Sequence, residues 1–230
     1  MFYLIGLGLS GEQDLTMKAV KALRKSKEVY LEYYTSMAPE LKIKKLEEMI
    51  KKKVKKLKRE DVETGDLILR SKRANIALII IGDPLTATTH TELLLECRKN
   101  GIKYEVIHNA SVQTAVGETG LQLYKFGRTI SVPFHAAESY LQVIKQNQAM
   151  GAHTLCLLDL DVENKRFMTV NEALERLKLR DDEKIVVVSR LGCGEQKIKY
   201  VKPGDARELL LKSPCSIIIP GKLNFKEEEY

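Results

Sequence analysis

The chain has 230 residues and a mass of 26.1 kDa, which allows one large domain or two small ones. Its 44% apolar and 30% charged residues exclude a wholly disordered protein, and its longest apolar run, residues 76–81, is far shorter than the ~20 residues of a membrane-spanning helix. The net charge of +7 comes from one segment, residues 42–59, whose ten Lys or Arg against two Glu give +8.

Short apolar runs recur along the chain and, because most lack strict alternation, predict strands that are buried on both faces. These runs are residues 2–5, 29–31, 76–81, 104–107, 154–158, 185–188 and 216–219. Helical signals lie between many of them: the apolar face of residues 15–23, capping boxes at Thr89-x-x-Glu92 and Thr169-x-x-Glu172, and a helix from Pro203 to Leu211. The alternation predicts an α/β fold with mostly parallel sheet.

The basic segment 42–59 has apolar positions, from Ile43 to Leu57, that fit one helical stripe. A helix with a solvated basic face is the simplest interpretation, and docking of an acidic partner or RNA is the alternative. No aromatic residue lies between the lysines, so base stacking is unsupported and we expect no direct contact with nucleic acid.

The best candidate for a domain boundary is the sequence IHNAS, residues 107–111, which follows a predicted strand and precedes a helix. A division there gives two α/β domains, residues 1–110 and 111–230, with an inter-domain cleft as the default ligand site. We expect the acidic end, residues 226–230, to be frayed. The four widely spaced cysteines include no CxxC pair, which argues against a zinc site and fits a cytoplasmic protein.

Residues 6–11 read GLGLSG, a GxGxxG pattern between a predicted strand and a predicted helix. Glu32 lies 21 residues beyond Gly11, which is the spacing of a carboxylate that binds the ribose of NAD. The pattern alone is a weak signal, because glycines at such a turn often serve only close backbone packing. A dinucleotide, a purely structural turn and another ligand in this loop all remain open.

A second loop follows the buried run at residues 76–81 and reads GDPLTATTH, residues 82–90. A buried strand that ends in Gly-Asp-Pro places loop atoms at the edge of the sheet where α/β proteins bind ligands. The alternative is a simple turn in which Asp83 makes a local hydrogen bond. The histidines His90 and His108 border these motifs, but none of the four histidines has metal-ligand spacing, so we expect structural roles.

Several motifs together resemble the diphthine synthases, methyltransferases of diphthamide biosynthesis with a tetrapyrrole-methylase-like fold. The resemblance runs nearly end to end. It rests on YLIGLGL (3–9), GDPLTATTHTEL (82–93), VIHNASV (106–112), AVGETGLQLYKFG (115–127), HTLCLLDLD (153–161), MTVNEA (168–173) and IIIPGKL (217–223). Relative to the family pattern, the stretches after Pro133, Asp161 and Arg190 are short. The resemblance therefore does not predict how this chain binds a protein substrate.

The resemblance implies two α/β domains with mostly parallel or mixed sheets and with S-adenosylmethionine as cofactor in the cleft between them, in a cytoplasmic homodimer. It implies translation elongation factor 2 as substrate, methylated on the amino group of a modified histidine; a small or tetrapyrrole-like acceptor is the alternative. By motif, the cofactor contacts are expected at Leu9, Asp83, Thr86, Ser111, Val112, Leu158, Leu191 and Cys215.

The implied reaction needs little acid–base help, because the sulfonium donor is already activated and about a tenth of an α-amino group with a pKa near 8 is neutral at pH 7. We therefore expect catalysis by positioning, with no metal and no indispensable catalytic side chain. In the motif Tyr124-Lys125-Phe126, we expect the two aromatic rings in the core, while the role of Lys125 is open.

Overall fold

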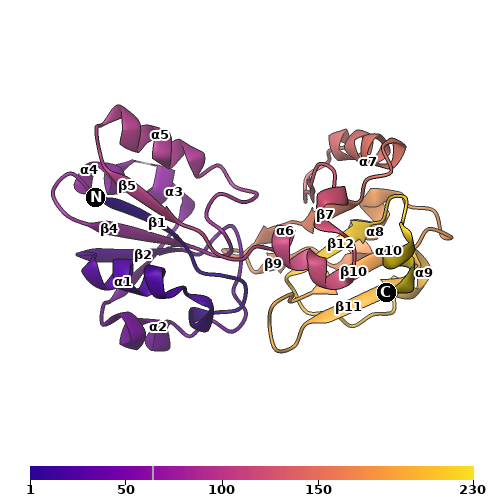
Figure 1. Cartoon of the computed structure of the whole chain (residues 1–230), viewed down its shortest axis with the longest axis horizontal. Helices are drawn as coiled ribbons and strands as arrows, with labels where there is room; N and C mark the ends of the chain where they lie inside the picture. Colours follow the sequence, from indigo (N-terminus) through magenta and orange to yellow (C-terminus); the bar gives the residue numbers. More distant parts are fainter. Residues whose placement is uncertain (64) are drawn as a thin grey trace. The chain divides into compact units, whose positions relative to one another are not determined.

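The computed structural model describes residues 1–63 and 65–230. The chain divides into two compact units, Met1–Val112 and Gln113–Tyr230, and each contains one five-stranded sheet (Figure 1). Within the described residues, no helix has both the length and the apolar character to cross a membrane.

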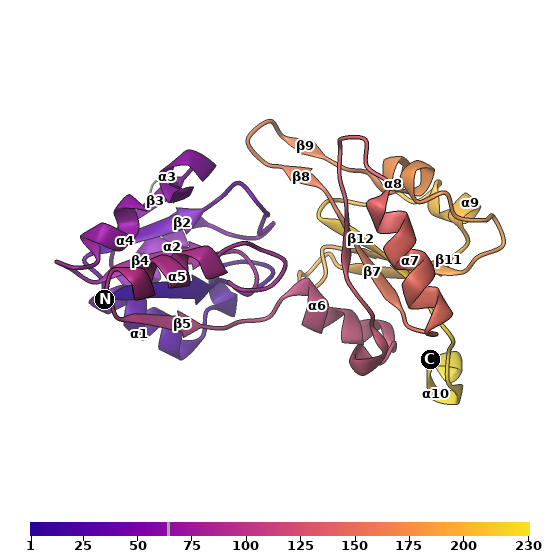
Figure 2. The ribbon, with the colours of Figure 1, turned by 90° about the horizontal axis from the view of Figure 1, so that it is seen from above.

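The first unit contains a parallel sheet in the strand order β3-β2-β4-β1-β5 (Figure 2). Its strands are β1 (Phe2–Gly6), β2 (Glu28–Glu32), β3 (Val54–Leu57), β4 (Ile76–Ile80) and β5 (Tyr104–Ile107). The central strands β1 and β4 are buried along their whole length, which is why their sequences are apolar without alternation. The predicted α/β class and the parallel sheet are confirmed here.

Helices cover both faces of this sheet, because the first two connections lie on one side of it and the next two on the other. The connections hold η1 (Glu12–Asp14), α1 (Met17–Lys25), α2 (Ile43–Ile50), α3 (Arg59–Glu63), α4 (Asp66–Arg70) and α5 (Thr91–Lys99). Helices α1 and α2 pack on the strand face that carries Ile5 and Ile79. Helices α4 and α5 pack on the opposite face, which carries Leu4 and Leu78.

The prediction of one helical stripe through residues 42–59 is wrong. Helix α2 ends at Ile50, where Lys51 adopts a left-handed conformation with φ of 57°. Residues Val54–Leu57 then form the edge strand β3, which pairs in parallel with β2. Two adjacent lysines between two half-buried apolar residues resemble a helical pattern over so short an edge strand, and the lysines also discourage pairing with other chains.

The second unit has a mixed sheet in the order β11-β10-β12-β7-β6, in which only β6 and β7 are parallel. Its strands are β6 (Ile130–Val132), β7 (Thr154–Leu158), β10 (Ile185–Ser189), β11 (Lys197–Val201) and β12 (Cys215–Ile219), beside a separate hairpin of β8 (Leu160–Asp161) and β9 (Arg166–Phe167). The helical segments are α6 (Val112–Ala115), η2 (Val116–Thr119), η3 (Leu123–Lys125), α7 (Ser139–Ala149), α8 (Val170–Leu177), α9 (Pro203–Ala206) and α10 (Phe225–Glu229).

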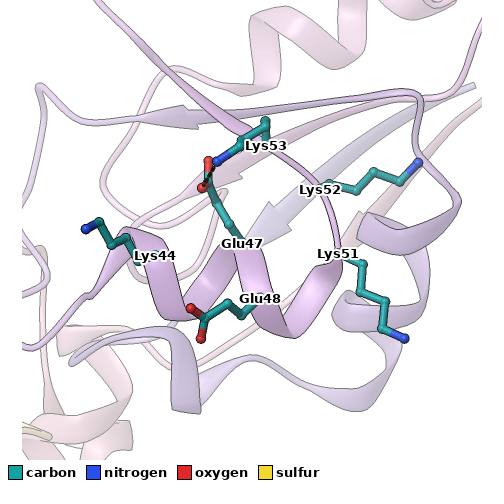
Figure 3. Close-up of a pocket in the computed structure, with 6 residues that line it drawn as sticks. All are labelled: Lys44, Glu47, Glu48, Lys51, Lys52 and Lys53. Carbon is teal, nitrogen blue, oxygen red and sulfur yellow. Dashed lines mark hydrogen bonds and ion pairs between the residues drawn. The ribbon is translucent and has the colours of Figure 1, made fainter.

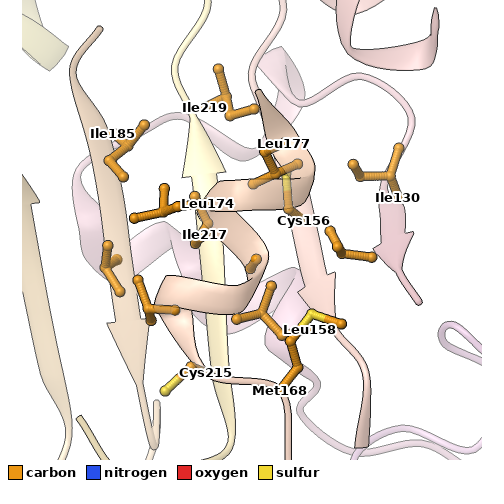
Figure 4. Close-up of a cluster of buried hydrophobic side chains, with 14 of the residues drawn as sticks. Ile130, Cys156, Leu158, Met168, Leu174, Leu177, Ile185, Cys215, Ile217 and Ile219 are labelled. Carbon is orange, nitrogen blue, oxygen red and sulfur yellow. The ribbon is translucent and has the colours of Figure 1, made fainter. Parts of the chain in front are cut away.

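The core of the second unit lies between its sheet and helices α7 and α8. Figure 4 shows Leu174 and Leu177 of this helix against strand residues that include Ile185 and Ile217. All four cysteines of the chain are free and buried. Burial raises the pKa of the Cys97 thiol to about 11, and that of Cys156 further still, so these side chains act as small apolar core residues.

The N-termini of three helices can be compared with the helix starts predicted from the sequence. The capping box of Thr169 and Glu172 is present, so that prediction is confirmed. The box predicted at Thr89 is absent, because α5 begins at Thr91 with His90 as its N-cap. Pro203 does open a helix, but the helix ends at Ala206, well before Leu211.

The prediction of a frayed C-terminus is also wrong, because α10 is anchored by Glu227, whose side chain is fully buried. Its carboxylate accepts hydrogen bonds from the backbone of Gln122 and Asn224, from His153 Nε2 and from Lys125 Nζ. Lys125 is thus the ion-pair partner of a buried carboxylate, while its own side chain is 20% exposed.

The two aromatic neighbours of Lys125 differ from each other. Phe126 is half-buried and packs edge-on against the ring of His153, with ring centroids 5.2 Å apart. Tyr124 is 81% exposed, so its predicted place in the core is wrong.

Candidate functional site

The two sequence loops meet at the carboxyl ends of β1 and β4, which are neighbours in the first sheet. The Gly82 amide donates to the Gly8 carbonyl at 2.8 Å, and the Gly8 amide donates back to Gly82 at 3.3 Å. Helix α1 leaves β1 toward one face of the sheet, and α5 leaves β4 toward the other. This is the switch point at which open α/β sheets bind their ligands.

Asp83 joins the second loop to the end of β5. Its Oδ1 accepts hydrogen bonds from the Leu85 amide at 3.0 Å and the Thr86 hydroxyl at 3.2 Å. Its Oδ2 accepts from His108 Nδ1 at 2.8 Å and from the Asn109 amide at 3.2 Å. Although burial opposes ionisation, these donors hold the pKa of Asp83 below its ordinary value, so the carboxylate is charged at neutral pH.

The first loop is closed on itself by Asp14. The Asp14 carboxylate accepts the Ser10 amide at 2.7 Å and also the Ser10 hydroxyl. Gly8 has φ of +97°, and a Cβ there would lie 2.3 Å from Cβ of Asp14, so the loop requires glycine at this position. Asn109 completes the packing by donating to the carbonyls of Gly6 and Asp14.

This geometry argues against the dinucleotide interpretation of GLGLSG. In that motif an α-helix opens at the third glycine and presents its N-terminus to a diphosphate, whereas here Gly11 is followed by the three-residue 3-10 turn η1 and α1 begins only at Met17. The Ser10 amide already serves the Asp14 carboxylate, and a second anion would be repelled by it. Glu32 is buried against His90 rather than presented to a ribose.

Three predicted contacts lie together at one edge of the second sheet. Leu158 ends β7 and Cys215 begins the antiparallel strand β12, each one residue beyond the register pair Leu157–Ser216. Ser189 of β10 pairs with Cys215 on the other side, and Leu191 follows two residues later. All three predicted residues are buried, and burial raises the pKa of the Cys215 thiol, so these three side chains are apolar and uncharged at neutral pH.

The structure therefore sorts the predicted contacts into two groups. Leu9, Asp83 and Thr86 lie in the two bridged loops of the first unit, and Ser111 and Val112 follow the strand end to which Asp83 is bonded. Leu158, Leu191 and Cys215 form the group in the second unit. Asp14 and Asn109 hold the loops in place, yet the sequence alone did not single them out; only the position of Asn109 in the IHNAS motif pointed to it.

The basic segment forms a separate surface feature. A hollow of about 450 Å³ lies over the end of α2 and is lined by Lys44, Glu47, Glu48, Lys51, Lys52 and Lys53 (Figure 3). Glu47 binds Lys53 across it at 2.9 Å. Its lining consists of charged side chains only, which is typical of a solvated surface rather than a small-molecule pocket.

Comparisons with known proteins agree with this architecture. The family model of the tetrapyrrole (corrin/porphyrin) methylases matches residues 1–206. A diphthine synthase from Methanococcus aeolicus is 42% identical over 246 positions, and a diphthine methyl ester synthase from Dictyostelium discoideum is 37% identical over 266 positions. Both alignments cover 100% of this chain and 96% of the relative.

A solved diphthine synthase structure has a TM-score of 0.91 and 36% identity, and the match covers 100% of this chain and 94% of that one. The chain therefore belongs to the tetrapyrrole (corrin/porphyrin) methylase family, in which it groups with the diphthine synthases as a methyltransferase.

Proposed function

We propose that the protein uses S-adenosylmethionine to methylate the amino group of a modified histidine in translation elongation factor 2. The observation that carries the proposal is the pair of bridged loops at the switch point of the first sheet. The diphthine synthase relatives support the substrate, since diphthine is a modified histidine of that factor. We propose that the enzyme acts in the cytoplasm as a homodimer of two-domain chains, divided near residue 110.

The chemistry of the loops fits a cationic ligand better than an anionic one. Asp83 and Asp14 both lie at this edge of the sheet, and the hydrogen bonds to Asp83 keep it ionised. A Cβ at Gly82 would meet only the Ala110 carbonyl, at 4.0 Å, so glycine leaves open space there. A sulfonium nucleoside suits carboxylates and carbonyls, whereas the phosphates of a dinucleotide would be repelled.

We propose that the loops of the first unit hold the cofactor through Leu9, Asp83, Thr86, Ser111 and Val112, while Leu158, Leu191 and Cys215 supply an apolar surface. Because all four acceptor positions of the Asp83 carboxylate are used by the protein, its role is to shape the loop and set the local charge. Leu9 and Thr86 flank the Gly8–Gly82 bridge.

When bound, S-adenosylmethionine supplies an electrophilic methyl group that needs no further activation. The residues of the chain then have to align the acceptor nitrogen with that group and exclude water. Well-aligned reactants gain ~7–11 kcal/mol from proximity, which is enough without a strong general base. About a tenth of an amine with a pKa near 8 is neutral at pH 7, and water can accept its proton.

Titration calorimetry of the full chain with S-adenosylmethionine and with NAD separates the two cofactor hypotheses. We expect saturable binding of S-adenosylmethionine at one site per chain and no heat with NAD at the same concentration. The control variant is Glu48→Ala, which changes an exposed residue of α2. It should give the same results as the wild type with both ligands. Binding of NAD without binding of S-adenosylmethionine would refute the proposal.

A further inference from the structure

A second buried acid–base pair lies beside the candidate site. Glu32 ends β2 and His90 ends the second loop, and their side chains are 1% and 6% exposed. His90 Nε2 is bonded to Oε2 of Glu32, while the hydroxyl of the exposed Thr35 donates to Oε1. On the other side of the ring, Nδ1 lies 2.7 Å from the Thr88 hydroxyl and 3.2 Å from the Pro84 carbonyl. The imidazole thus links β2 to the loop through both of its nitrogens.

The pair completes the anchoring of a loop that is held at both ends. At its start, residues 82 and 83 are fixed by the Gly8 bridge and by the bonds from Asp83 to the end of β5. At its end, His90 is fixed to β2 by Glu32. The segment between these anchors, residues 84–89, contains Thr86, which we have proposed as a cofactor contact.

The backbone of this segment is strained. Ala87 has φ of +55°, a left-handed conformation that costs an alanine free energy, and its side chain is exposed. An exposed alanine gains too little from packing to hold such a conformation, so the anchors at the two ends must maintain it. Burying an imidazole and a carboxylate is itself costly, and apolar side chains would pack this site at least as well.

We propose that Glu32 and His90 are a positioning pair, which keeps residues 84–89 in the conformation that binds the methyl donor. This inference rests on the proposed function. It predicts that the polar link, rather than the mere filling of space, fixes the loop. Leucine at both positions should therefore leave the fold intact, but residues 84–89 should no longer be held in their conformation.

The test compares the full-length wild type with the double variant Glu32→Leu/His90→Leu. We expect peptide-level hydrogen exchange at residues 84–89 to become at least tenfold faster, while exchange in β4 and the urea midpoint stay at wild-type values. We expect the dissociation constant for S-adenosylmethionine to rise at least tenfold. If exchange and affinity both match the wild type, the pair only fills space and the proposal is wrong.

The matched control removes the pair at the other end of the same strand, through Glu28→Leu/Arg70→Leu. It should leave exchange at residues 84–89 unchanged. A second variant, His90→Asn, can replace Nδ1 but is too short to reach Glu32, so it should also accelerate exchange in the loop; protection at the wild-type level would overturn the proposal. Because exchange is measured without cofactor, a wild type that fails to bind S-adenosylmethionine would refute the proposed function and still leave this result decisive.

Discussion

Replacing Glu227 with alanine is expected to lower the free energy of unfolding by about 3–5 kcal/mol, the usual cost of breaking a buried ion pair from one side. The change removes the acceptor of four hydrogen bonds and leaves the Lys125 ammonium without its buried partner. It also removes half of the capping box that opens α10. Urea denaturation at pH 7 measures the effect.

Glu228 provides the matched control, since it follows Glu227 in the same helix and is exposed. Alanine at this position should change the free energy of unfolding by less than about 0.5 kcal/mol. Equal effects of the two substitutions would mean that α10 is not anchored by the buried carboxylate, and the sequence-based expectation of a frayed end would stand again.

Glu227 and its hydrogen-bond partners also make the free energy of unfolding depend on pH. Burial opposes the charge of Glu227, but hydrogen bonds from Lys125 and from backbone amides lower its pKa from 4.5 to about 2. Since the unfolded chain binds this proton more readily, the contribution is fully present above pH 4.5 and is lost as the pH falls toward 2. The difference in pKa corresponds to about 3 kcal/mol.

His153 adds a second window at higher pH, with the same sign. Burial lowers the pKa of its imidazole below 6.5, and its Nδ1 accepts the Gly221 amide at 2.9 Å, which requires a neutral ring. Below pH 6.5 the unfolded chain therefore takes up a proton that the folded chain resists. Unfolding followed from pH 8 to pH 3 should show both losses, and Glu227→Gln should flatten the lower one. A pH-independent free energy would contradict this assignment.

Exchange of Asp83 for alanine is expected to weaken binding of S-adenosylmethionine more than tenfold and to cost about 2–3 kcal/mol of stability. The substitution leaves the amides of Leu85 and Asn109 without their acceptor, and an unpaired buried donor costs about 1–3 kcal/mol. It also frees the second loop from the end of β5. Calorimetry and urea denaturation on the same samples measure the two effects.

Asp83→Asn tests whether charge or shape matters more. It keeps one acceptor oxygen and loses the charge that His108 and the sulfonium group favour. We expect affinity between those of the wild type and the alanine variant. Unchanged affinity in Asp83→Ala, with the stability lowered as expected, would show that the loop does not contribute to the donor site.

The central strands could be predicted from sequence because a strand that is buried on both faces consists almost entirely of apolar residues. β4 is an unbroken apolar run and β12 is interrupted by Ser216 alone, and each was predicted at nearly its true position. The edge strands β3 and β11 were not predicted, because each has a partner on one side only and combines lysines with a few apolar residues. Over four or five residues such a pattern does not distinguish a strand from a helix.

Contacts between residues far apart in the sequence could not be predicted either. Glu32 and His90 are 58 residues apart, and Glu227 lies 102 residues beyond Lys125. Nothing local marks Glu32 as the partner of a histidine, and its spacing from the glycine loop suggested a ribose instead. Local composition likewise made the acidic end look frayed, since the buried partners of Glu227 lie elsewhere in the chain.

The most direct test of the account is a methyl-transfer assay with labelled S-adenosylmethionine and elongation factor 2 that carries the unmethylated aminocarboxypropyl histidine. We expect label in the modified factor and none in a factor whose histidine is unmodified. An unlabelled factor, in the presence of an enzyme that binds the cofactor tightly, would contradict the proposed substrate.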